Sequence, residues 1–138
     1  MIQSFVQDKY GFIWIGTRYG LNRFDGINIK SWFYDPHDDH SLMNSYVYSL
    51  YRDSKGNLWV GTKSGLCRYD YSNNQFIRYT SSPVTITDIL EDKKGRIWLG
   101  SQNGLWIVDE QKQAIEKFEL KNDTVFKKNF QCAIYQMI

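Results

Sequence analysis

The chain has 138 residues, of which 42% are hydrophobic and 17% aromatic, and its formal net charge is +2. A soluble chain of this size buries about two thirds of its unfolded surface, so the composition excludes a disordered chain and allows a core without metals or disulfides. Lys and Arg are scattered among Asp and Glu, which argues against a nucleic-acid or anionic-membrane surface.

One pattern of residues occurs three times along the chain. The aligned segments are residues 8–21 (DKYGFIWIGTRYGL), 53–66 (DSKGNLWVGTKSGL) and 92–105 (DKKGRIWLGSQNGL). Trp14 and Trp59 are 45 residues apart and Trp59 and Trp98 are 39 apart, a period that β-propeller blades and helical solenoids share. Gly interrupts each repeat at short intervals, and the pieces between are β-branched and aromatic, so the repeats favour strands.

Turn residues divide each repeat into four strands. Asp53 and Gly56 occupy the first and fourth positions of a type I turn, where Asp bonds to the turn backbone and Gly accepts a positive φ. Further turns are predicted at 62–65, and after the third strands at 25–26, 70–74 and 109–113. The predicted strands of the middle repeat are residues 45–52, 57–62, 66–70 and 75–79.

The second strand of each repeat is apolar on both faces. Leu58 and Val60 point to one face and Trp59 to the other, which requires a covering sheet on each side. Radial stacking of four-stranded sheets, as in a β-propeller, meets this requirement. The predicted fold class is therefore all-β, with about three four-stranded antiparallel blades.

Residues that recur in every repeat are predicted to be structural, because a function that is specific to one site has to break the symmetry. The recurring residues are Asp8, Gly11, Trp14, Gly16, Gly20, Asp53, Gly56, Trp59, Gly61, Gly65, Asp92, Gly95, Trp98, Gly100 and Gly104. The three Asp residues occupy identical turns, so they are not predicted to be catalytic.

The expected organisation is an incomplete propeller, because closed propellers have about four to eight blades. The expected units are blade one at about 1–34, a linker at 35–44, blade two at about 45–80, blade three at about 84–120 and the start of a fourth blade at about 129–138. Both ends look severed, and the two terminal blade faces would be apolar. We therefore expect self-association, for example of two copies in a six-bladed ring.

The two cysteines, Cys67 and Cys132, are expected to pack rather than to form a disulfide or a zinc site. No stretch reaches the roughly 18 apolar residues of a membrane span, and the first residues lack the regions of a signal peptide. The sequence thus predicts no membrane segment and no nucleic-acid contact in this chain.

The repeated pattern, Asp-x-x-Gly-x-Leu/Ile-Trp-x-Gly-Thr-x-x-Gly-Leu-x-x-Tyr/Phe-Asp, resembles the regulator propeller repeat of bacterial two-component sensors, notably the hybrid systems of gut bacteria that degrade glycans. Residues 8–26 also resemble the first blade of such sensors, and residues 35–42 resemble the linker that follows it. Ser101 replaces the usual Thr, and Val108 replaces the aromatic residue before Asp109, so blade three departs most from the pattern.

The resemblance implies a periplasmic sensor with two propellers, an immunoglobulin-like domain, a membrane span, a histidine kinase, a receiver and a helix-turn-helix domain. It implies an oligosaccharide ligand and control of the transcription of polysaccharide-utilisation genes. The kinase histidine is not expected in this chain, so the chain itself is predicted not to be an enzyme, and no cofactor is predicted.

Candidate ligand-binding residues lie where the repeats diverge. The loops between the second and third strands share one face of a propeller with the blade connections, and they carry Arg18 and Tyr19, Lys63 and Ser64, and Gln102 and Asn103. The linker 35–44 holds the six extra residues of the first period, and inserted loops tend to carry function. Ordinary exposed turns and simple variation in loop length remain the alternative interpretations.

His37 and His40 in the linker are further candidates for ligand contact. Together with the neighbouring acidic residues 35, 38 and 39 they resemble a metal site, but one His-x-x-His in a flexible acidic loop is not sufficient to predict one. The sequence contains no phosphate loop, no nucleophile elbow and no His outside the linker that could act as a base. The alternatives to a sensor are an interaction propeller and a fragment of a propeller lyase or glycosidase.

Overall fold

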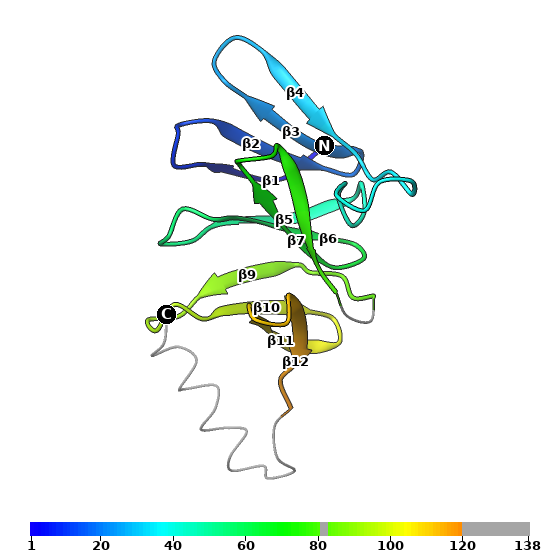
Figure 1. Cartoon of the computed structure of the whole chain (residues 1–138), viewed down its shortest axis with the longest axis vertical. Coiled ribbons are helices and arrows are strands. Elements are labelled where there is room, and N and C mark those ends of the chain that lie inside the picture. Colours follow the sequence, from blue (N-terminus) through cyan, green and yellow to red (C-terminus); the bar gives the residue numbers. More distant parts are fainter. Residues whose placement is uncertain (81–82, 120–138) are drawn as a thin grey trace.

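The structure is a computed structural model that describes residues 1–80 and 83–119. This part of the chain forms three four-stranded antiparallel sheets and contains no helix (Figure 1). The strands are β1 (Ile2–Gln7), β2 (Ile13–Thr17), β3 (Gly20–Phe24) and β4 (Ile29–Trp32) in the first sheet, β5 (Val47–Arg52), β6 (Leu58–Thr62), β7 (Leu66–Asp70) and β8 (Gln75–Tyr79) in the second, and β9 (Asp88–Glu91), β10 (Ile97–Ser101), β11 (Gly104–Asp109) and β12 (Ala114–Lys117) in the third. The described residues hold no helix of the length and apolarity of a membrane span.

The four predicted strands of the middle repeat and the predicted turns are confirmed. Each sheet is an up-and-down meander in which consecutive strands pair. Gly56 has a φ of 83° in its turn, and the Asp25 carboxylate accepts hydrogen bonds from the backbone N–H groups of Ile27 and Asn28 at 2.8 and 2.6 Å. The local turn chemistry therefore sets the strand boundaries.

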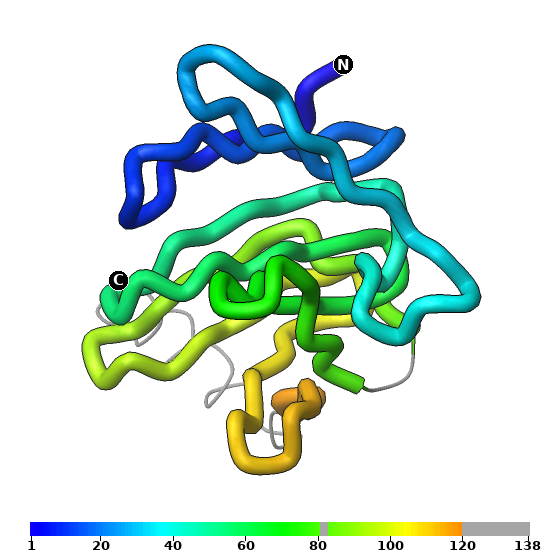
Figure 2. Tube along the Cα trace, turned by 45° about the horizontal axis from the view of Figure 1, so that its top comes forward, coloured from blue at the N-terminus to red at the C-terminus, as the bar shows by residue number. Residues whose placement is uncertain are grey.

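The three sheets stack face to face in chain order (Figures 1 and 2). The first strands of the sheets are neighbours, with β1 against β5 and β5 against β9. One apolar cluster fills the space between the first two sheets and another fills the space between the second and third. Every residue of β6 is buried, as its two-sided apolar pattern predicts, and the predicted all-β propeller-blade fold is confirmed.

Each recurring Asp bonds to the Trp six residues further on. The indole N–H groups of Trp14, Trp59 and Trp98 donate to the carboxylates of Asp8, Asp53 and Asp92 at 2.7, 2.8 and 2.8 Å. The other oxygen of each carboxylate accepts two backbone N–H groups of its turn. A buried polar ring edge is satisfied in this way, and the strand that follows the turn is anchored to it.

The recurring Gly in the second strand allows the next sheet to approach closely. A Cβ atom at Gly61 would overlap Ser49 Oγ and would lie 2.8 Å from the carbonyl oxygen of Ile86. At the same position of the first sheet, a Cβ atom at Gly16 would lie 2.6 Å from Val47 Cγ1. The repeat thus requires Gly here for sheet packing rather than for turn geometry.

The remaining sequence expectations concern the cysteines and the unit boundaries. Cys67 is fully buried between the first two sheets, as expected for a packing residue, and burial raises the pKa of its thiol to about 12. The described sheets span residues 2–32, 47–79 and 88–117, with the linker between the first two. Cys132 and the predicted fourth-blade segment 129–138 lie outside the described residues.

Candidate functional site

The predicted loop residues lie on one side of the molecule, which we call the connection side. It holds the linker and the β2–β3, β6–β7 and β10–β11 loops, at the right of Figure 1. Arg18, Lys63, Gln102 and Asn103 are exposed there, and the side chain of Tyr19 is 77% exposed.

The three loops share one hydroxyl-based turn. In the second loop, the hydroxyl of Thr62 accepts the Ser64 N–H at 3.3 Å and donates to the Gly65 carbonyl at 2.8 Å. Ser101 makes the same two hydrogen bonds, at 3.1 and 3.0 Å. The departure from Thr in the third repeat therefore preserves the turn, because the hydroxyl is the group that is needed.

The structure joins the Lys63–Ser64 loop to its neighbours. Asn44 Nδ2 donates to Ser64 Oγ at 2.8 Å, the Lys63 N–H donates to the Tyr46 carbonyl at 3.0 Å, and Thr85 Oγ1 donates to the Lys63 carbonyl at 2.8 Å. The loop between β6 and β7 is therefore held by both adjoining sheet connections, while the Lys63 side chain stays exposed.

Two tyrosines beside these loops were missed by the sequence reasoning. The rings of Tyr46 and Tyr48 stack with their centroids 4.2 Å apart and an interplanar angle of 7°, and the Arg18 guanidinium lies 5.7 Å from the Tyr46 ring. Tyr48 lies in the β-bulge between Val47 and Ser49, and a bulge changes the direction of a side chain relative to regular strand alternation. A hydrogen bond to Tyr46 raises the pKa of Tyr48. The sequence signal for this pair was the Tyr46-x-Tyr48 pattern, because the third repeat has Thr85-x-Thr87 at the same positions.

The linker is bound to the second sheet, which corrects the expectation of a flexible loop. The Arg78 guanidinium donates to the carbonyl oxygens of Ser41, Leu42 and Asp38 at 3.0, 3.2 and 3.1 Å, and to Ser41 Oγ at 2.9 Å. Leu42 is fully buried, and the Phe76 N–H donates to the His40 carbonyl at 2.8 Å. The composition of the linker alone suggested a flexible loop. The residues that hold the linker lie more than 30 residues further along the chain, so its own sequence does not reveal these contacts.

A groove runs between the linker and the edges of the first two sheets. This linker groove has a volume of about 470 Å³ and is lined by residues 31–36, 38, 40, 41, 74 and 75. Its exposed rings are Phe33 and Tyr34, which are 56% and 45% exposed, and the Arg78 guanidinium lies 5.7 Å from the Tyr34 ring. His40 and Gln75 add polar groups to the same groove. An aromatic wall with polar neighbours suits a ligand that has both apolar and hydroxyl faces.

The two histidines of the linker are separated by this geometry. His40 lines the linker groove, whereas His37 is exposed on the turn before it. The carboxylates of Asp35 and Asp38 accept the backbone N–H groups of His37 and His40, each at 2.9 Å. Within residues 1–80 and 83–119, no three His, Cys, Asp or Glu side chains are placed to hold a metal ion.

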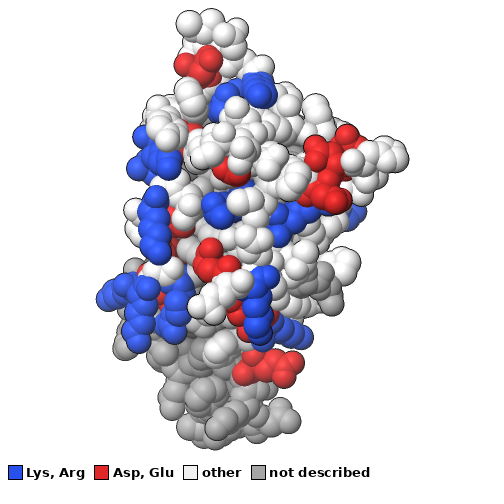
Figure 3. All heavy atoms as spheres, viewed as in Figure 1, with Lys and Arg blue, Asp and Glu red and all other residues white. Residues whose placement is uncertain are grey.

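Charges of both signs are interspersed over the face shown in Figure 3. This arrangement agrees with the scattered charges of the sequence and with the net charge of +2. A ligand of high charge density would find no large surface of one sign on that face.

The two component regulator propeller family matches residues 1–19, 41–64 and 80–103. These segments include the Asp turn and the second strand of all three repeats. Histidine kinase P4 of Formosa agariphila is 50% identical over 36 residues, which are 26% of this chain and 3% of that protein.

Solved structures share the architecture. The extracellular domain of BT4673 from B. thetaiotaomicron, described as a putative one component or hybrid two component system, matches in two structures with TM-scores of 0.70 and 0.64 and identities of 28% and 29%. The match covers 81% of this chain and 17% of that chain. A virginiamycin B lyase from Staphylococcus aureus, at 18% identity and a TM-score of 0.65 over 91% of this chain and 43% of that one, shares the fold alone. In one segment of each of its three repeats, the chain is thus similar to the two component regulator propeller family.

Proposed function

We propose that this chain is part of the extracytoplasmic, periplasmic sensor module of a hybrid histidine kinase, and that it recognises an oligosaccharide and thereby controls the transcription of polysaccharide-utilisation genes. The observation that carries the ligand class is the linker groove, with its exposed Phe33 and Tyr34 rings beside His40 and Gln75. The sensor role is supported by the family repeats and by the likeness to the BT4673 extracellular domain.

The chemistry of an oligosaccharide fits this groove. The C–H face of a pyranose ring packs on an aromatic ring, and its hydroxyl groups exchange water for polar side chains at little net cost when each finds a partner. Tyr34 offers a ring with a polar edge, and the stacked Tyr46–Tyr48 pair offers a second aromatic surface beyond the other end of the linker. The linker is specific to the first connection, so the proposed site breaks the symmetry of the repeats.

Titration calorimetry of the full chain against a panel of neutral, amino and uronic-acid oligosaccharides tests this proposal. Heat without turnover supports sensing, turnover supports the lyase or glycosidase alternative, and silence supports an interaction propeller. Tyr34→Ala should weaken binding about tenfold, because one aromatic contact of this kind is worth about 0.5–1.5 kcal/mol beyond its area. Tyr10→Ala, at a 62% exposed ring in the β1–β2 turn outside the groove, is the matched control. Equal affinity of Tyr34→Ala and the parent would place the ligand elsewhere.

A further inference from the structure

The interface between the first and second sheets and the interface between the second and third sheets are filled by different side chains at the end of the sheets that lies away from the connection side. At the first of these interfaces, Tyr71 from the β7–β8 turn reaches the first sheet, and its hydroxyl donates to Asp8 Oδ2 at 2.9 Å. The Tyr71 ring packs edge-on to Tyr10 at 5.2 Å and to Tyr69 at 4.9 Å, and Lys9 Nζ lies 4.9 Å from it. A hydroxyl-bearing ring therefore fills this space.

The second interface lacks both of these rings. Tyr69 and Tyr71 lie 10 and 12 residues after Trp59, and the residues at the same distances after Trp98 are Val108 and Glu110. Glu110 Oε2 accepts a hydrogen bond from the Tyr79 hydroxyl at 3.2 Å rather than reaching the Asp turn. Asn57 Nδ2 takes the place of the Tyr hydroxyl, donating to Asp53 Oδ2 at 3.0 Å.

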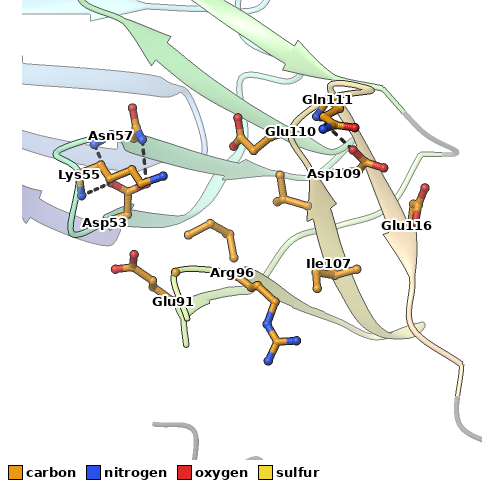
Figure 4. A pocket seen from close by; sticks show the side chains of 13 residues that line it. Asp53, Lys55, Asn57, Glu91, Arg96, Ile107, Asp109, Glu110, Gln111 and Glu116 are labelled. Carbon is orange, nitrogen blue, oxygen red and sulfur yellow. Dashed lines mark hydrogen bonds between the residues drawn. The ribbon is translucent and has the colours of Figure 1, made fainter. Parts of the chain in front are cut away.

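These replacements leave an open space, the inter-sheet cleft, with a volume of about 610 Å³. It is lined by residues 53, 55, 57, 91, 95–97, 107–111 and 116. Figure 4 shows Asp53, Lys55 and Asn57 of the β5–β6 turn on one side of the cleft, with Glu110 of the β11–β12 turn and Asp109 at the end of β11 on the other. The volume lies inside the range of about 300–1,000 Å³ that is usual for small-molecule sites.

We propose that the inter-sheet cleft binds one pyranose unit of a neutral oligosaccharide, in the place where the first interface holds the Tyr71 ring. The apolar side chains of Ile97, Ile107 and Val108 offer a surface for the C–H face of the sugar. Lys55, Asn57 and Glu110 offer donors and acceptors for its hydroxyl groups. This inference rests on the proposed function for its ligand class, but it assigns a site on the opposite side of the molecule from the linker groove.

The charges of the lining restrict the ligand further. The lining contributes five carboxylates, against the two basic side chains of Lys55 and Arg96 and the neighbouring Lys112, which pairs with Asp109 and Glu116. The carboxylates are those of Asp53, Glu91, Asp109, Glu110 and Glu116. Uronic-acid and sulfated sugars would therefore meet repulsion. A purely apolar ligand would leave the polar groups of the cleft without partners, which disfavours its binding. Neutral, hydroxyl-rich rings satisfy both conditions.

Two substitutions of Glu110 in the full chain test this proposal. Glu110→Tyr restores the residue that fills the first interface, so it should raise the melting temperature and weaken binding of cellobiose, maltose or xylobiose by about tenfold or more in calorimetry. Glu110→Gln keeps the shape and the hydrogen-bond acceptor, and should change affinity by no more than about threefold. Lys93→Tyr, which places the same ring at an exposed position of the β9–β10 turn outside the cleft lining, is the matched control.

The possible results separate the two sites. Loss of disaccharide binding in Glu110→Tyr but not in Tyr34→Ala supports the cleft, and the reverse result supports the linker groove and overturns this inference. Loss of binding in Glu110→Gln, or a preference for digalacturonic acid, would show that charge rather than hydroxyl recognition governs the cleft and would also overturn it. Failure of the parent chain to bind any of the three neutral disaccharides contradicts it as well.

Discussion

At the scale of the residue, the Asp–Trp pair organises each repeat. A single carboxylate closes the turn with one oxygen and holds the indole of the second strand with the other. The fourth hydrogen bond to each carboxylate differs, since it comes from Tyr71 at Asp8, from Asn57 at Asp53 and from the Arg96 guanidinium at Asp92. The repeat thus keeps one carboxylate role while its surroundings vary.

The stabilisation by the Asp92 carboxylate makes the free energy of unfolding depend on pH. Burial opposes the charged form, but hydrogen bonds from Trp98, from the Arg96 backbone and side chain, and from the Lys94 backbone outweigh it and lower its pKa to about 2. Because this folded-state pKa lies below the unfolded value of about 4, the stabilisation is present above pH 4 and is lost as the pH falls towards 2.

Asp92→Asn should therefore lower the free energy of unfolding at pH 6, and the difference from the parent should shrink between pH 4 and pH 2. Urea unfolding at a series of pH values measures both quantities. Asp39→Asn, at an exposed linker position, controls for the loss of one negative charge. A difference that stays constant from pH 6 to pH 2 would contradict the proposed stabilisation by the Asp92 carboxylate.

At the scale of the element, β6 is the centre of the structure. It lies in the middle sheet, its five residues are buried on both faces, and its Gly61 is in close contact with the connection to the third sheet. Trp59 packs edge-on to Tyr79 at 5.0 Å and belongs to the apolar cluster between the second and third sheets. The packing of two interfaces therefore passes through one strand.

Trp59→Ala should reduce the free energy of unfolding by about 3–5 kcal/mol, because it leaves a cavity and removes the indole donor from Asp53. Chemical denaturation of this chain is the measurement. Tyr19→Ala, at a side chain that is 77% exposed, should change stability by no more than about 0.5 kcal/mol. A Trp59→Ala variant that melts within a degree or two of the parent would show that β6 does not anchor the packing.

At the scale of the whole molecule, the first sheet presents apolar side chains outward. Phe5, Ile27 and Ile29 of the first sheet are 71%, 87% and 66% exposed. On the third sheet, Trp98 and Leu99 are buried, and the mainly apolar groove that they line with Ile89, Leu90 and Leu105 has a volume of about 160 Å³. In a propeller these are the faces that neighbouring blades cover.

We therefore predict that this chain self-associates at micromolar concentration, because a second copy would cover the apolar outer face of the first sheet. Light scattering after size-exclusion chromatography should give a mass above that of one chain. Phe5→Lys, which places a charge on the outer face of the first sheet, should shift the equilibrium to the monomer, whereas Lys9→Ala in the Asp turn should not. A monomeric parent chain at these concentrations would contradict the prediction.

The sequence by itself determined the strands, the turns and the Trp and Gly positions of the repeat, because these depend on contacts within a few residues. Asp53 bonds to atoms no more than six residues away, and such a contact is readable from spacing. Tertiary structure alone decided that Arg78 binds the linker and that Tyr46 and Tyr48 stack beside Arg18. It also decided that a cleft lies beside Glu110 between the second and third sheets, whereas the Tyr71 ring fills the corresponding space between the first and second. A sequence pattern shows which residue differs between repeats but not which space its side chain occupies.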